Sequence, residues 1–107
     1  MLFRSTAKAE IINYHKKPSL ISITTEVDKT NNSILLKWNY NPEGVRSMLI
    51  YRRLGNEPLT LYKSEKPASN QFVDTNLMPN TIYTYRLRAD YIDGGSSPFT
   101  KEIEISY

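Results

Sequence analysis

The residue types that do catalytic chemistry are few in this chain, and their spacing does not bring them together. The 107 residues include one histidine, His15, and no cysteine. A zinc site needs three or four clustered ligands, and a catalytic triad needs a histidine within reach of a serine. A single histidine in the basic run His15-Lys16-Lys17 meets neither requirement. We therefore expect no metal site, no cofactor and no catalytic residue.

The carboxylates are a second possible source of chemistry, because a glycosidase places two of them across one cleft. Glu102 and Glu104 share the outward face of one predicted strand. A final hairpin centred on Asp93–Ser97 places Arg88 opposite Glu102. The same register places Arg86 opposite Glu104. The pattern therefore predicts a solvated row of ion pairs, each contributing a few tenths of a kcal/mol, and not a catalytic pair.

Composition and charge exclude several other classes of protein. Fourteen Lys and Arg against eleven Asp and Glu give a net charge of +3, with both signs interleaved along the chain. A nucleic-acid binder concentrates its basic residues in one patch, so we expect no nucleic-acid partner. No stretch has the ~18 apolar residues of a membrane-spanning helix, so we expect no membrane insertion. The first residues also lack the apolar run and cleavage site of a signal peptide.

The elements that must position these residues are strands. Apolar and polar residues alternate with a period of two along Ser33–Tyr40 and Tyr83–Tyr91, which is typical of antiparallel sheets with one buried face. Eight tyrosines suit the half-buried positions of such strands. Turn residues divide the chain into seven predicted strands, near residues 20–27, 33–40, 45–53, 59–63, 71–75, 83–91 and 102–106. The fold class is therefore all-β, a seven-stranded antiparallel β-sandwich.

Three motifs make residues 18–107 resemble a fibronectin type III domain, which has an immunoglobulin-like sandwich. The first is Trp38 at the end of an early alternating strand. The second and most specific is the run Leu77-Met78-Pro79-Asn80-Thr81-Ile82-Tyr83, which leads into a long alternating strand. The third is Gly95-Ser96-Ser97-Pro98 before the last strand. The lack of cysteine also favours this family over immunoglobulin domains, whose sheets are bridged by a disulfide.

The resemblance implies structural roles for the residues of these motifs. Leu77 and Pro79 would form a corner where the chain crosses between the sheets. The hydroxyl of Tyr83 would then bond to the backbone a few residues upstream, as in a tyrosine corner. Six residues are expected to carry the structure of the sandwich: Trp38, Leu77, Pro79, Tyr83, Tyr85 and Leu87.

The resemblance also implies a non-catalytic function, that of an accessory, spacer or interaction module in a larger extracytoplasmic protein. Its partners would be neighbouring domains of the same polypeptide, at an extracellular, cell-surface or periplasmic location. The runs Leu49–Arg53 and Phe72–Leu77 look like those of bacterial members, which are often appended to secreted polysaccharide-degrading or cell-surface proteins. The integrin-binding Arg-Gly-Asp loop is replaced here by Asp93-Gly94-Gly95-Ser96.

The alternative is a module that binds a protein or carbohydrate ligand through an outer sheet face or the loops. Five residues form the candidate binding surface: Leu49, Tyr51, Arg53, Arg86 and Arg88. A tyrosine beside an arginine is common at binding surfaces, and it is equally ordinary cross-strand packing. An exposed, contiguous aromatic patch would favour binding, whereas an ion-paired polar face would favour a spacer.

Residues 1–17 are predicted to be an extension or linker before the sandwich. The spacing of Lys8, Ile12 and Tyr14 recurs at the end of the chain. Residues 5–14 are therefore either the last strand of a preceding domain in a tandem repeat or a coincidental match. A strand without its own sheet can add to the edge of a second molecule, so a dimer through this strand is a candidate assembly.

Overall fold

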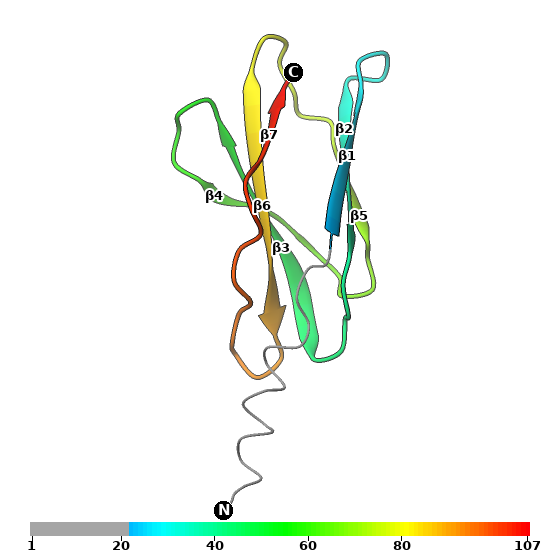
Figure 1. Cartoon of the computed structure of the whole chain (residues 1–107), viewed down its shortest axis with the longest axis vertical. Coiled ribbons are helices and arrows are strands. Elements are labelled where there is room, and N and C mark those ends of the chain that lie inside the picture. Colours follow the sequence, from blue (N-terminus) through cyan, green and yellow to red (C-terminus); the bar gives the residue numbers. More distant parts are fainter. Residues whose placement is uncertain (1–21) are drawn as a thin grey trace, which may run out of the picture.

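A computed structural model describes residues 22–107 as seven strands in two antiparallel sheets (Figure 1). This confirms the predicted all-β, seven-stranded sandwich. None of these residues forms a helix that could cross a lipid bilayer. The predicted linker, residues 1–17, and its candidate strand and dimer lie outside the described residues. The division at residues 17 and 18 stays a prediction.

The strands lie close to their predicted positions, and they form a three-stranded and a four-stranded sheet. The three-stranded sheet has the order β1-β2-β5, with β1 at Ser22–Asp28, β2 at Ser33–Asn39 and β5 at Gln71–Asp74. The four-stranded sheet has the order β4-β3-β6-β7, with β4 at Thr60–Glu65, β3 at Val45–Leu54, β6 at Ile82–Tyr91 and β7 at Ile103–Ser106.

The core fills the space between the two sheets. Alternate residues of the long strands point into it, because successive side chains of a strand lie on opposite faces. The fully buried side chains with no exposed area include Ile34, Leu36, Met48, Ile50, Tyr83, Tyr85 and Leu87. Trp38 lies in the same cluster and is 4% exposed.

The predicted register of the last hairpin is wrong. Thr84 lies opposite Glu104, and Tyr85 lies opposite Ile103. The physical reason is that side-chain hydroxyls join the ladder before β7 begins. The backbone N–H of Ala89 donates to Ser97 Oγ at 2.8 Å, and that of Leu87 donates to Thr100 Oγ1 at 3.0 Å. Residues 97–101 are therefore irregular, and the register shifts.

The predicted ion pairs between the last two strands are consequently absent from the described residues. Glu102 pairs instead with Arg53 on β3, at 3.2 Å. The Nε atom of Arg86 donates to the Thr100 carbonyl at 2.9 Å. The arginines of β6 thus do not meet the glutamates that sequence alternation assigned to them.

The described chain ends near the top of the sandwich in Figure 1, and it begins about midway along the sandwich, where β1 starts. Tyr107 ends beside the β1–β2 turn, where its carbonyl accepts from Lys29 and its hydroxyl donates to Asn32. β1 begins away from this turn, because Ser22 lies opposite Asn39, the last residue of β2.

Candidate functional site

The outer face of the four-stranded sheet brings the five candidate surface residues together. Leu49 lies opposite Arg88, and Tyr51 lies opposite Arg86, on the neighbouring strands β3 and β6. Arg53 is the next residue along this face of β3. All five are half-buried. The alternation of the sequence therefore places these side chains on one surface.

Phe99 is the centre of this face, although the sequence pattern did not indicate it. Its ring meets that of Tyr51 edge to face, with centroids 4.9 Å apart. The guanidinium of Arg88 lies 4.5 Å from the centroid of Phe99, and that of Arg86 lies 5.1 Å from it. Each such contact contributes about 0.5–1 kcal/mol at an exposed site. Phe99 follows a proline in the irregular segment before β7, so no period-two signal marked it.

A second group of polar side chains lies inside the sandwich and was also not predicted. Arg52 on β3 and Asp74 on β5 form an ion pair at 2.8 Å between the two sheets. Arg52 is 8% exposed and Asp74 is 1% exposed. Arg52 has the strand parity of the core residue Ile50, and this parity was the available signal. The pair thus joins the two layers through the core.

Every oxygen of the buried carboxylate has partners. Tyr62 donates to one oxygen of Asp74 at 2.9 Å, and the backbone N–H of Asn76 donates to it at 3.1 Å. Tyr85 donates to the other oxygen at 2.5 Å, beside Arg52. The Arg52 guanidinium also stacks over the Tyr62 ring at 4.0 Å. Each oxygen of the buried carboxylate therefore has two hydrogen-bond partners, as a stable buried charge requires.

The corner before β6 has the geometry of a tyrosine corner. The backbone N–H of Met78 donates to the Tyr83 hydroxyl at 2.6 Å. Leu77 is buried, while Pro79 is exposed on the turn. Asn80 has a φ of 60°, a left-handed conformation that asparagine tolerates better than most residues. The hydroxyl of Tyr83 therefore satisfies a backbone donor where the chain crosses between the sheets.

Comparisons with known proteins agree on the architecture. No family model matches the chain, and no curated protein matches its sequence. Among solved structures, an Fn3-like protein from Clostridium thermocellum has a TM-score of 0.67 at 22% identity, covering 86% of this chain and 95% of that one. The chain has the fibronectin type III fold.

Two other structures show this fold within larger chains. The FN1–FN3 domains of chicken CNTN1 match with a TM-score of 0.69 at 19% identity, covering 81% of this chain and 29% of that one. Pectate lyase PelI from Erwinia chrysanthemi matches with a TM-score of 0.64 at 13% identity, covering 78% of this chain and 28% of that one. Domains with the fibronectin type III fold are commonly accessory modules of larger proteins, but fold alone does not establish function.

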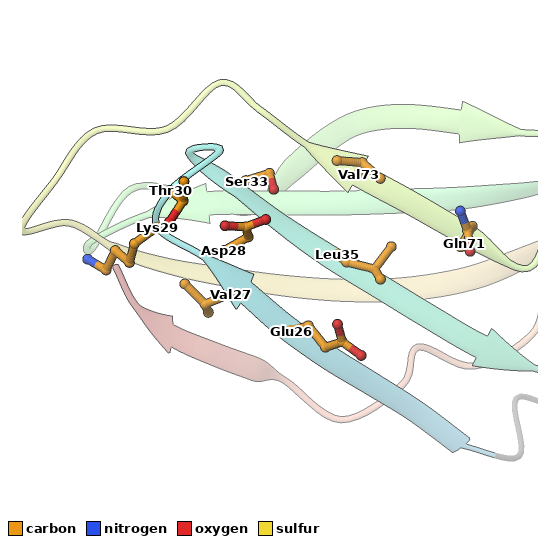
Figure 2. A pocket seen from close by; sticks show the side chains of 9 residues that line it. All are labelled: Glu26, Val27, Asp28, Lys29, Thr30, Ser33, Leu35, Gln71 and Val73. Atoms are coloured by element: carbon orange, nitrogen blue, oxygen red, sulfur yellow. The ribbon is translucent and has the colours of Figure 1, made fainter.

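The fibronectin type III sandwich also has a shallow hollow of about 670 Å³ on its three-stranded sheet. Figure 2 shows that its side chains come from β1, β2, β5 and the β1–β2 turn. Leu35 on β2 lies opposite Val73 on β5 in the sheet. The Asp28 carboxylate accepts two hydrogen bonds from Asn31, which lower its pKa and stabilise the turn. Among residues 22–107, no group of acidic or histidine side chains could hold a metal ion.

The tyrosine corner of the fibronectin type III sandwich predicts the effect of Tyr83→Phe. Removing the hydroxyl leaves the Met78 N–H without its acceptor, at a cost of about 1 kcal/mol or more. Urea denaturation should show a lower midpoint with an unchanged slope. Tyr51→Phe is the matched control, because the Tyr51 hydroxyl has only a long contact with Arg88, at 3.4 Å. An equal midpoint for Tyr83→Phe and the wild type would contradict this role.

The buried network predicts a loss of stability at alkaline pH. The pKa of Tyr85 is far above its ordinary value, mainly because the hydroxyl is buried. The hydrogen bond to Asp74 and the negative charge of that carboxylate raise the pKa further. The Tyr85 hydroxyl loses its proton near pH 10 in the unfolded chain but keeps it in the folded chain. The contribution of Tyr85 to the free energy of unfolding is therefore fully present below about pH 10 and is lost as the pH rises above that value. Above about pH 10, Tyr85 should lower the free energy of unfolding by about 1.4 kcal/mol per pH unit.

Denaturation of the wild type and Tyr85→Phe between pH 8 and about pH 11 measures this slope. The difference in unfolding free energy between the two proteins should be constant below about pH 10 and should shrink above it. Other tyrosines and the lysines titrate in both proteins, so their effects cancel in the difference. A difference that stays constant across the whole range would show that Tyr85 does not retain its proton in the folded state.

Proposed function

We propose that this chain is a non-catalytic spacer or accessory module that holds neighbouring domains of a larger extracytoplasmic protein at a fixed separation. The observation that carries the proposal is the position of the chain ends. Ser22 begins β1 about midway along the sandwich, and Tyr107 ends beside Lys29 at the β1–β2 turn (Figure 1). Segments that leave the sandwich at Ser22 and at Tyr107 would then start from opposite ends of β1.

The internal bracing supports a rigid module. The core strands β3 and β6 have ten residues each and run side by side along the sandwich. The Arg52–Asp74 pair links the two sheets through buried side chains. A packed core with a cross-sheet polar network resists local deformation, because each sheet is bonded to the other.

The polar surface supports a spacer over a ligand-binding module. Tyr51 and Phe99 are half-buried, and their rings are in contact with Arg86 and Arg88. Arg53 is paired with Glu102. A protein or carbohydrate ligand that stacks on aromatic rings would have to displace these arginines. This binding function is therefore the weaker alternative for the outer face.

The larger relatives of this fold support an accessory role. The match to pectate lyase PelI covers 28% of that chain, so a sandwich of this kind is a minor part of that enzyme. The pectate lyase activity is that of the whole PelI protein, of which the matched sandwich is one part. We propose the equivalent arrangement here, with the catalytic or surface function residing in other domains of the parent polypeptide.

A distance measurement tests the spacer. Two fluorescent reporter proteins are fused to the ends of the full chain, and single-molecule energy transfer is recorded with and without denaturant. The expected result is one narrow distance distribution that broadens when the sandwich unfolds. A flexible Gly/Ser linker of equal length serves as the control, with a broad distribution under both conditions. A native distribution as broad as that of the linker would reject the proposal.

A further inference from the structure

Strand β1 lies at the edge of the three-stranded sheet, and one of its sides has no neighbour. β1 pairs with β2 on one side, and no strand among residues 22–107 pairs with the other side. The unpaired N–H and C=O groups of an edge strand can pair with another chain, so proteins commonly protect such an edge by making it short, irregular or charged. The open side of β1 is therefore a candidate point of association.

The other edge strands have such protection, since β5 and β7 have only four residues each. β4 carries Lys63, and the register between β3 and β4 shifts between Ile50 and Tyr51. β1 has seven residues, pairs with β2 without a register shift and contains neither proline nor lysine. Its two charged residues, Glu26 and Asp28, lie toward its end. β1 is therefore the longest regular open edge among the described strands.

The hydrogen bonds of β2 show which backbone groups of β1 are unpaired. The N–H of Trp38 donates to the Asn70 carbonyl at 3.0 Å, on the β5 side of β2. Successive residues of a strand direct their backbone groups to opposite sides, so Lys37 bonds on the other side, to its partner Thr24 on β1. The same alternation along β1 leaves three residues with their N–H and C=O groups on the open side: Ile23, Thr25 and Val27.

We propose that this open side pairs with β1 of a second copy of the chain, antiparallel and about a two-fold axis at Thr25. In this register Thr25 faces Thr25, and Ile23 of each copy faces Val27 of the other. Each of these pairs exchanges two hydrogen bonds, so about six backbone hydrogen bonds join the copies. A shifted register pairs fewer of these three residues with one another.

The side chains of β1 match each other in this register. Val27 is 44% exposed, and it is covered by Ile23 of the other copy, a half-buried residue that packs against the core. On the outer face, Glu26 of one copy lies opposite Thr24 of the other, so no two carboxylates face each other. Lys37, the partner of Thr24 on β2, has no ion pair among residues 22–107 and is then about 9.6 Å, or two strand spacings, from that glutamate. The pairing therefore covers an exposed apolar side chain and brings opposite charges together.

The length of β1 sets the strength of this dimer. Seven residues span about 24 Å, and one layer of a sandwich is about 10 Å thick, so the paired edge covers roughly 240 Å² on each copy. A standard interface buries about 800 Å² on each partner. The dimer is therefore weak and forms only at high protein concentration.

Sedimentation equilibrium of the full chain over micromolar to millimolar concentration tests the proposal. The apparent mass should rise from 12.4 kDa toward twice that value. Val27→Lys places a charge at the paired edge, so this variant should remain monomeric. Leu61→Lys is the matched control, because it makes the same change at a residue of β4 that is 54% exposed, and it should dimerise as the wild type does. A wild type that stays monomeric at millimolar concentration would overturn the proposal.

A proline at the two-fold axis tests the backbone pairing directly. Thr25→Pro removes the central N–H group, and proline is tolerated on an edge strand where this group faces solvent, so the variant should fold and remain monomeric. Thr24→Pro is the matched control, because the Thr24 N–H bonds to β2, and it should lower the melting temperature instead. A Thr25→Pro variant that folds and dimerises as the wild type does would contradict the two-fold pairing.

Hydrogen exchange of the backbone amides is the decisive experiment. The amide protons of Ile23, Thr25 and Val27 should exchange rapidly in dilute solution and more slowly as the protein concentration rises. The amide proton of Thr24, which is bonded to β2, should be protected at every concentration. A dimer without concentration-dependent protection of the three amides would overturn the proposal, because it would use another surface, such as the predicted strand at residues 5–14.

Discussion

Asp74→Ala is expected to lower the free energy of unfolding by about 3–5 kcal/mol. The substitution leaves the buried Arg52 guanidinium without a counter-charge and removes the acceptor of the Tyr62 and Tyr85 hydroxyls. Transferring a lone charge into the interior costs far more than the mutual attraction of the pair gains. The chain has one tryptophan, Trp38, whose fluorescence during urea denaturation reports the loss.

Asp90→Ala is the matched control for this prediction. Asp90 also pairs with an arginine, Arg46, at 2.7 Å, but the Arg46 side chain is 60% exposed. An ion pair that is accessible to solvent contributes at most about 1 kcal/mol. The two substitutions should therefore differ several-fold in their effect on stability. Equal effects would mean that the interior pair is solvated or that its arginine finds another partner.

Leu87→Ala is expected to have the second large effect, about 2–5 kcal/mol. Leu87 lies in the middle of β6 with no exposed area, so its removal leaves a cavity between the sheets. Leu61→Ala makes the same chemical change at a residue that is 54% exposed, and it should change stability by less than about 0.5 kcal/mol in dilute solution. A similar loss for both would indicate that the sheets repack around position 87.

The fold was predictable because its signal is local and repeated. Alternation along β2 and β6, with turn residues between the strands, defined the elements, and the Leu77–Tyr83 run defined one crossing. The register of the last hairpin was not predictable in this way. Hydroxyls of Ser97 and Thr100 compete with backbone acceptors for the N–H groups of β6. The alternation of polar and apolar residues does not show whether an N–H group of β6 will bond to a hydroxyl or to a backbone carbonyl.

The polar interior was missed for a different reason. Arg52 and Asp74 are 22 residues apart and belong to different sheets, so their contact depends on how the layers stack. A charged residue in an alternating strand is ordinarily assigned to the wet face. Tyr62, whose hydroxyl completes the buried network, was not indicated by the sequence pattern either. The surface residues of β3 and β6 were easier, because strand parity alone placed them together.

The buried pair also acts as a check on strand registration during folding. β5 has only four residues, Gln71–Asp74, and backbone pairing alone would tolerate a slip along β2. A slip of one residue would turn Asp74 outward and leave Arg52 in the core with no anion. Misregistered chains are therefore penalised by an electrostatic term that correctly paired chains avoid. A short strand at the sheet edge thereby gains a selectivity for its correct alignment that four residues of hydrogen bonding could not supply.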